Sequence, residues 1–240
     1  MKAASEIENR LLLGLPRREL EQLKPRLERV SLGYKDILVD DEASLDHVYF
    51  PNSGVVSVIG VYSTGETAEL ASIGREGTTG FQEILGARAS GTRLLVQIEG
   101  TAMRLRRSAY DRAVKELPGF RDLMYTYLHA FLQQLMLAGA CNGTHSVNQR
   151  LARWLLMMHD RSNGDTLPIT QDLIAEMLGV HRPTATKALG LLDDAGVIRA
   201  GRGRIDIVNR DGLTGHACEC YLLIRTRTAN LLPKTYSPRK

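Results

Sequence analysis

The chain has few of the features that mark disulfide-rich, secreted or membrane proteins. Only three cysteines, Cys141, Cys218 and Cys220, occur in 240 residues, which is too few and too scattered for a disulfide framework. Charged residues interrupt every apolar run well before the roughly 20 residues of a membrane span. The first ten residues, MKAASEIENR, lack the apolar core of a signal peptide. We therefore expect a cytoplasmic protein with no membrane partner.

The composition, 43% hydrophobic and 24% charged, indicates a globular chain with enough residues for two modest domains. The net charge of +4 is unevenly distributed. Residues 146–240 contain 14 Lys and Arg against 9 Asp and Glu, whereas residues 1–145 contain 17 against 18. A positive C-terminal part is expected where that part meets a polyanion such as DNA.

Residues 169–199 have the spacing of two helices joined by a tight turn. Thr170 can cap a first helix, and Gly179 can take the left-handed conformation that ends it. Val180 can fill the angle between the two helices. The apolar positions of the first helix recur at helical spacing: Leu173, Ile174, Met177 and Leu178.

The second helix begins with His181, Arg182, Pro183 and Thr184. Its predicted inward face is Ala185, Ala188, Leu189 and Leu192. The predicted outward face is Arg182, Thr184, Thr186 and Lys187. Donor side chains on the first turn of such a helix are typical of major-groove recognition, in which Arg pairs with guanine edges. The alternative is an ordinary helical hairpin with solvated basic residues.

The residues that follow favour DNA binding. Residues 197–208 predict two short strands around a glycine-rich turn that carries Arg202 and Arg204, which is typical of a basic wing. We expect phosphate anchoring by Thr170, Gln171, Arg202 and Arg204, and base contacts by Arg182, Thr184, Thr186, Lys187 and His181, with Pro183 in the same turn. The sequence thus predicts a regulator that binds double-stranded DNA.

The N-terminal half predicts a different architecture. Residues 6–28 suggest one or two short amphipathic helices, and residues 30–107 contain short β-type runs separated by glycine-bearing turns. No helical segment of crossover length lies between these runs, which argues against a parallel α/β sheet. We expect a β-sandwich or β-roll.

A long apolar helix is predicted over residues 118–140. Apolar residues recur there every three or four positions: Phe120, Met124, Tyr127, Phe131, Leu135 and Ala138. Leu123, Leu128 and Leu132 widen the stripe, so the helix needs two burial partners. We expect the β-roll on one side and a second copy of the chain on the other, with the six residues forming the dimer interface. A single buried helix in a monomer is the alternative.

Residues 141–145 are expected to break this helix and form a hinge, and Ser146 with Gln149 resembles a capping box that opens a further helix. Trp154 is expected on the inner face of that helix, as a core residue of the domain. The predicted organisation is α+β: a β-roll domain at 1–117, a dimerisation helix at 118–141, a hinge at 142–145 and a winged helix-turn-helix domain at 146–240.

Taken together, these elements resemble the Crp/Fnr transcription regulators along nearly the whole chain. The most specific segments are RLARWLLMMHDR, LPITQDLIAEMLGVHRPTATKALGLL and the late CECY. The resemblance implies a homodimer on a roughly palindromic site, and a cyclic-nucleotide-binding-like β-roll that senses a signal or contacts RNA polymerase. Thr170 looks like the family's phosphate-contacting cap and Arg182 like its guanine-reading arginine. Pro183 and Lys187 depart from the cyclic-AMP receptor pattern, so a different operator is implied.

The sequence also departs from the pattern of the family members that bind a cyclic nucleotide as their effector. Family members that bind cyclic nucleotides hold the phosphate with an Arg-Ser or Arg-Thr pair, whereas this chain reads GREGTTGFQEILGARASGTRLLVQ and contains no such pair. A buried phosphate without a charged partner would be costly. The sequence therefore argues against cyclic AMP and suggests a subgroup without the phosphate-binding motif. Arg75, Arg88 and Arg93 remain candidates for another nucleotide or anion.

We predict no metal or cofactor. An iron–sulfur cluster needs about four neighbouring thiolates, and Cys218 and Cys220 with only His216 nearby are weak for zinc, so structural cysteines are expected. Haem binding remains an alternative, with His47, His129 and His145 as candidate axial ligands.

Two other functions compete with DNA binding. A cupin-like metal enzyme would need several His and carboxylate ligands, but residues 30–107 offer only His47 with Glu66 and Glu69, so we do not expect an enzyme. The other is a sensory module that signals through protein contacts.

Overall fold

The computed structural model describes residues 7–233 and residue 235, so the ends of the first and last predicted domains lie outside the described residues. The N-terminal part contains η1 (Leu12–Gly14), α1 (Arg17–Leu23), η2 (Lys24–Arg26), β1 (Leu27–Leu32), β2 (Ile37–Val39), β3 (His47–Pro51), β4 (Val55–Val61), β5 (Thr67–Ile73), η3 (Glu83–Leu85), β6 (Arg93–Ile98), β7 (Gly100–Arg106) and α2 (Arg107–Glu116). The rest contains α3 (Pro118–Thr144), α4 (Val147–Arg161), β8 (Thr166–Leu167), α5 (Gln171–Leu178), α6 (Arg182–Asp194), β9 (Ile198–Gly201), β10 (Arg204–Ile207), α7 (Arg210–His216) and α8 (Cys220–Leu231).

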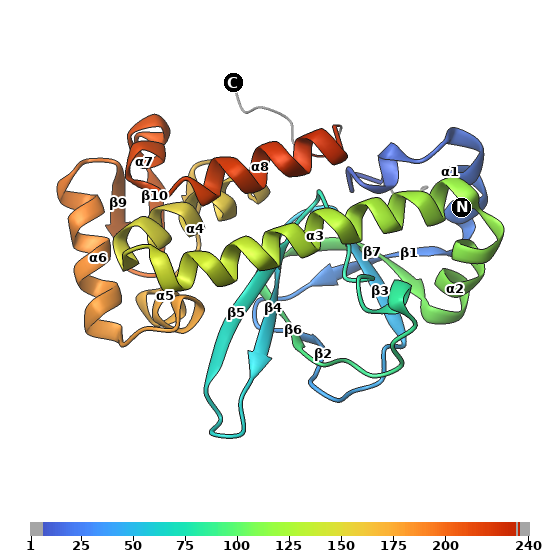
Figure 1. Ribbon diagram of the computed structural model, residues 1–240. Coiled ribbons are helices and arrows are strands. Elements are labelled where there is room, and N and C mark those ends of the chain that lie inside the picture. The colour runs from blue at the N-terminus through green and yellow to red at the C-terminus, as the bar shows by residue number, and fades with distance from the viewer. Residues whose placement is uncertain (1–6, 234, 236–240) are drawn as a thin grey trace.

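Two antiparallel sheets form the predicted β-roll. One has the strand order β1-β7-β3 and the other β2-β6-β4-β5. The apolar side chains of the strands meet between the sheets, where Phe50, Val58 and Leu94 are almost fully buried. Helix α3 runs across the roll, and α1 and α2 lie at its far end (Figure 1). The expected mixed α+β architecture is confirmed.

A side chain of helix α1 caps the N-terminus of α3. Pro118 occupies the first turn of α3, where a missing N–H does no harm. The next two N–H groups, of Gly119 and Phe120, donate to the Glu19 carboxylate at 3.0 and 2.7 Å. A negative charge at a helix N-terminus is favourable, so this contact fixes α1 to the long helix.

The long helix extends further than the sequence suggested. We expected residues 141–145 to break it, but α3 continues through Thr144. The buried Cys141 anchors the last turn, and the Thr144 hydroxyl donates to the Ala140 carbonyl at 2.9 Å. Only His145 and the Ser146 cap separate α3 from α4, and the predicted Ser146–Gln149 capping box is confirmed.

The C-terminal part contains the predicted winged helix-turn-helix. Strands β9 and β10 form the expected hairpin, to which β8, missed in the sequence, adds a third strand. Helices α7 and α8 were also missed; α8 packs along α3 (Figure 1). None of the helices in residues 7–233 combines the length and apolar character needed to cross a bilayer.

Candidate nucleic-acid interface

The turn between α5 and α6 has the geometry that the sequence predicts. The Leu173 N–H donates to the Thr170 hydroxyl at 3.2 Å, which caps α5. Gly179 ends α5 with a φ of +62°, in the left-handed region that favours glycine. Val180 then packs, partly buried, against the core of the C-terminal part. The two helices are therefore held at a fixed angle by local interactions and by the partly buried Val180.

Helix α6 presents the predicted polar side chains to solvent. His181 precedes it in extended conformation without a side-chain capping hydrogen bond, and Pro183 lies in its first turn. Its buried residues are Ala185, Ala188, Leu189 and Leu192, as predicted. The exposed residues, which we call the recognition face, are Arg182, Thr184, Thr186 and Lys187.

Two contacts hold the recognition face against α5. The Arg182 guanidinium lies 3.1 Å from the Asp172 carboxylate, and both side chains are about two-thirds exposed (65% and 68%). The Thr186 hydroxyl donates to the Gln171 side-chain oxygen at 3.1 Å. Exposed pairs contribute little stability, but they orient the side chains. Sequence reasoning missed Asp172, because its contact depends on the angle between the helices.

The wing lies beside α6 at the same end of the molecule (Figure 1). Gly203 forms its turn with a φ of +72°, and Arg202 beside it is exposed. Arg204 is 64% exposed and lies 3.9 Å from Asp206. Thr170 and Gln171 are exposed at the start of α5. The four predicted phosphate anchors are thus accessible on the same domain as the recognition face.

The predicted dimer interface is wrong for four of its six residues. Phe120, Met124, Tyr127 and Phe131 are at most 6% exposed within the single chain. They form part of the β-roll core; the centroid of the Phe131 ring, for example, lies 4.5 Å from that of the Phe81 ring. A side chain buried in its own subunit has no surface left for a second copy. The other two, Leu135 and Ala138, are half-buried.

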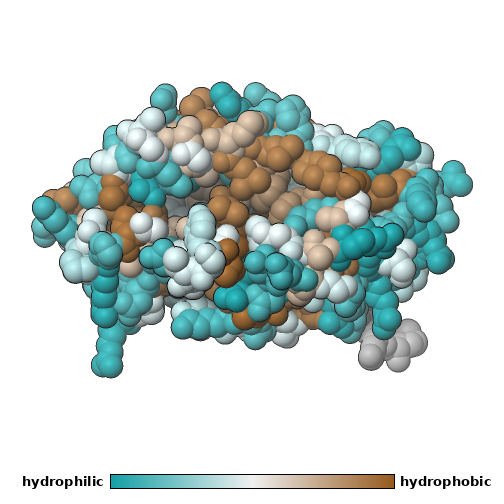
Figure 2. All heavy atoms as spheres, turned by 60° about the horizontal axis from the view of Figure 1, so that its bottom comes forward, coloured by the Kyte–Doolittle hydropathy of each residue, from teal (hydrophilic) through white to brown (hydrophobic). Residues whose placement is uncertain are grey.

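A different face of α3 is exposed. Its residues follow one another at alternating spacings of four and three, and we call them the α3 stripe: Tyr125, His129, Leu132, Met136, Gly139 and Gly143. Leu132 and Met136 are 44% and 66% exposed. In Figure 2, hydrophobic residues form a band across the upper part of the face shown, where α3 lies. Both faces of α3 are apolar with the same spacing, so the sequence did not distinguish them.

The three candidate effector arginines have separate surroundings. The Arg93 guanidinium makes an ion pair with Asp40 at 2.7 Å. Arg75 donates to the side-chain oxygen of Asn163, and Arg88 is exposed after η3. In the loop where the resemblance places a phosphate-binding pair, the Gln82 amide instead donates to the Ser90 hydroxyl at 2.9 Å.

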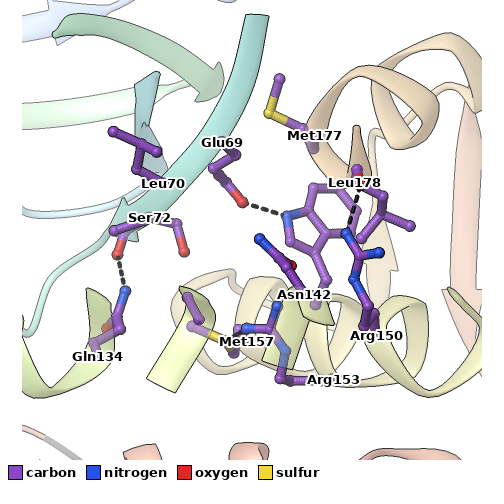
Figure 3. Close-up of a pocket in the computed structure, with 13 residues that line it drawn as sticks. Glu69, Leu70, Ser72, Gln134, Asn142, Arg150, Arg153, Met157, Met177 and Leu178 are labelled. Carbon is purple, nitrogen blue, oxygen red and sulfur yellow. Dashed lines mark hydrogen bonds between the residues drawn. The ribbon is translucent and has the colours of Figure 1, made fainter. Parts of the chain in front are cut away.

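The β-roll contacts the C-terminal part mainly through β5 and the turn after it. The Trp154 indole of α4 donates to the Glu69 carboxylate at 2.7 Å, beside a cavity of about 20 Å³. Figure 3 shows residues that line this cavity, with Glu69 of β5 facing α4. That volume is room for about one water molecule. Burial raises the pKa of Glu69, against the opposing effect of the hydrogen bonds from Ser57 and Trp154. Trp154 is a core residue, as predicted, with one polar contact.

The three cysteines meet at the junction of α3, α4 and α8. The Cys141 and Cys218 sulfurs lie 3.5 Å apart, and the Cys220 sulfur lies 3.7 Å from Nδ1 of His145. Burial raises the pKa of the Cys218 thiol to about 12, and the neighbouring Cys141 adds to the rise. The nearby histidine is therefore His145, not His216 as the sequence suggested.

These elements define a two-part protein in which an antiparallel β-roll is joined by a long helix to a winged helix-turn-helix. Residues 149–215 match the family model of the Crp-like helix-turn-helix domain. The chain therefore carries a Crp-like helix-turn-helix domain, and its fold is that of the Crp/Fnr transcription regulators.

Three solved structures illustrate the likeness. FixK2 from Bradyrhizobium japonicum superposes with a TM-score of 0.69 at 17% identity, covering 80% of this chain and 98% of that one. The CRP-family regulator TTHB099 from Thermus thermophilus gives 0.66 at 18% identity, covering 80% and 99%. The c-di-GMP-responsive regulator CLP of Xanthomonas campestris gives 0.62 at 14% identity, covering 80% and 99%. A comparison with curated protein sequences finds no match.

Proposed function

We propose that the protein is a transcription regulator that binds double-stranded DNA as a homodimer, with α6 of each subunit in a major groove of a roughly palindromic operator. The observation that carries the proposal is the recognition face. Its donor side chains occupy the first turns of α6 and are exposed to solvent. Donors at the start of such a helix are what reading of base edges in the major groove requires.

We assign base reading and backbone contacts to different residues of the interface. Arg182 would read guanine, because its guanidinium can donate two parallel hydrogen bonds. Thr184, Thr186, Lys187 and His181 would contact neighbouring bases or phosphates. Thr170, Gln171, Arg202 and Arg204 would hold the backbone, which gives affinity and register but little sequence information. Asp172 would release Arg182 to the base when the duplex arrives, since their exposed pair is weak.

The α3 stripe supports the homodimer. Its alternating spacing of three and four is that of a coiled-coil seam, and a seam that meets its own copy is self-complementary, as a twofold dimer requires. Gly139 and Gly143 have open space around them, so a second helix could approach closely. Two α6 helices in successive major grooves on one side of the duplex would have to lie about one helical turn apart, roughly 34 Å.

The β-roll would then receive a signal or contact RNA polymerase, in a cytoplasmic protein without enzymatic activity. The metal-enzyme alternative finds no support in the β-roll. Within the part of the chain that the structure describes, the only group of at least three metal-ligating side chains placed together lies outside it. His47 faces Arg104 and Arg106, and burial together with these charges lowers its pKa.

The proposal is tested by selecting duplexes that bind the protein from a random pool and measuring the affinity of two variants for the selected site. Arg182→Ala should cost about 1–3 kcal/mol and relax the preference at one base pair of each half-site. Arg202→Ala should weaken all sequences similarly and reduce the salt dependence by about one unit of slope.

The matched control is Arg112→Ala, which removes an exposed arginine from α2 in the β-roll. It should leave affinity and salt slope unchanged. If all three variants bind like the unmodified protein, or if no duplex is selected at low salt, the chain does not read DNA through α6. Signalling through protein contacts then becomes the better explanation.

A further inference from the structure

One cluster of side chains has no part in DNA binding. Cys141 and His145 lie one helical turn apart at the end of α3, whereas Cys218 lies two residues before α8 and Cys220 is the first residue of that helix. The four ligand atoms, three sulfurs and one imidazole nitrogen, all lie within 4.8 Å of one another. The three cysteines are buried and His145 is half-buried. Two elements 77 residues apart in the chain thus converge on one point.

Two distances within the cluster are close to those around a single tetrahedral ion. Around Zn²⁺ with Zn–S bonds of about 2.3 Å, two sulfurs lie about 3.8 Å apart, and a sulfur and an imidazole nitrogen about 3.5 Å apart. The corresponding distances here are 3.5 Å and 3.7 Å. A cluster of several iron atoms would hold its ligands farther apart, and a disulfide would hold Cys141 and Cys218 at about 2.05 Å.

We propose that Cys141, His145, Cys218 and Cys220 form a structural Zn²⁺ site. Three thiolates with one neutral imidazole are an established donor set for structural zinc, and soft sulfur ligands favour Zn²⁺ over Mg²⁺ or Ca²⁺. All four positions of the tetrahedron come from the protein, which leaves none open for water or substrate. The site is therefore structural, not catalytic.

Positively charged side chains next to the cluster are compatible with cysteines in their thiolate form. Three thiolates, a neutral imidazole and a dication carry a net charge of −1. Arg150 and Arg153 of α4 interact electrostatically with the cysteines from the adjoining helix. Their Nε–H groups are buried and donate no hydrogen bond to the described residues. Guanidinium groups in this position would offset the negative charge of the loaded site.

The position of the site indicates what it stabilises. Its ligands join the end of α3, immediately before α4, to the start of α8, which packs back along α3. Zinc would therefore fix the helix-turn-helix domain to the long helix at the one point where the chain passes between them. Because a structural ion binds the folded state preferentially, its removal lowers the stability of this junction.

The test uses the full chain, produced without an affinity tag and purified under reducing conditions without chelators. Elemental analysis should find about one equivalent of zinc per chain. After acid or chelator treatment, the apoprotein should bind Co²⁺ with the thiolate charge-transfer and intense d–d absorption of a tetrahedral sulfur-rich site. Its melting temperature should fall on metal removal and recover with Zn²⁺.

The variants Cys218→Ser and His145→Ala should lose the zinc, whereas the matched control His216→Ala should keep it, because His216 is exposed and outside the cluster. If the variants fail to fold, the Co²⁺ titration of the unmodified apoprotein decides alone. Protein without zinc that also gives no Co²⁺ charge-transfer band overturns the proposal, as does a Cys141–Cys218 disulfide in freshly isolated, alkylated protein. Neither result would affect the proposed DNA binding.

Discussion

At the scale of single residues, Glu83 is the clearest departure from ordinary packing. Its side chain in η3 is almost fully buried, and no side chain of the described residues donates a hydrogen bond to its carboxylate. Burial raises its pKa to about 7, although nearby backbone N–H groups and the charge of Arg107 oppose the shift. An ionised carboxylate in such a place is costly, so Glu83 carries a penalty that depends on pH.

The sign of this dependence follows from the pKa. The folded state holds the Glu83 proton more tightly than the unfolded chain does, so stability falls as the pH rises from about 4.5 through 7 and then levels off. Glu83→Gln should therefore match the unmodified protein near pH 4.5 and exceed its free energy of unfolding at pH 8.5 by up to about 3 kcal/mol. Urea unfolding at both values measures this. Glu66→Gln, at an exposed position, is the control; a gain of equal size at both values would contradict the prediction.

At the scale of elements, β5 and its turn hold the C-terminal part through a buried ion pair. The Arg161 guanidinium of α4 lies 2.8 Å from the Glu76 carboxylate, with exposures of 1% and 9%. Removing one partner leaves the other charge buried, which costs about 3–5 kcal/mol. We expect Arg161→Met to destabilise by that amount, measured by chemical unfolding.

The double variant Arg161→Met with Glu76→Gln should lose less than the sum of the single variants, because neither charge is then stranded. Asp40→Asn, which breaks the more exposed pair with Arg93, should destabilise the protein much less, because solvent screens exposed ion pairs. Additive losses in the double variant would mean that Arg161 acts through packing alone.

Elements also show what the sequence can predict. The Thr170 cap, the Gly179 and Gly203 turns and the Ser146–Gln149 box are local, so each could be inferred from a few neighbouring residues. The contact between Arg182 and Asp172 and the meeting of Cys141 with Cys218 depend on packing between elements. No local pattern specifies them. Most of the recognition face was therefore predictable, whereas the cysteine cluster was not.

For helix α3, the sequence pattern predicted the helix but assigned the wrong face to the dimer interface. Its periodicity correctly indicated two apolar faces, but periodicity does not say which face meets which partner. The larger aromatic residues, including Phe120 and Phe131, fill the wide space of the β-roll core. The exposed face includes two glycines, Gly139 and Gly143, beside which a second helix can approach closely. Assigning the faces required the roll itself.

At the scale of the whole molecule, the proposed dimer and the proposed DNA binding are coupled, because a palindromic operator is read by two subunits. Each subunit alone would contact one half-site, with about half of the phosphate contacts of the dimer. The affinity for a full operator should therefore depend on the α3 stripe even though no stripe residue touches DNA.

Met136→Lys tests this coupling. The side chain is 66% exposed in the single chain, so a lysine there is tolerated in the monomer, but in the dimer the twofold axis would bring two buried charges into the seam. We expect light scattering to find monomers at concentrations where the unmodified protein is dimeric. Binding to a full operator should weaken strongly, whereas binding to an isolated half-site should not change. Leu85→Lys, at a 69% exposed leucine in η3, should leave both properties intact. A Met136→Lys protein that stays dimeric would place the subunit contact elsewhere than on the α3 stripe.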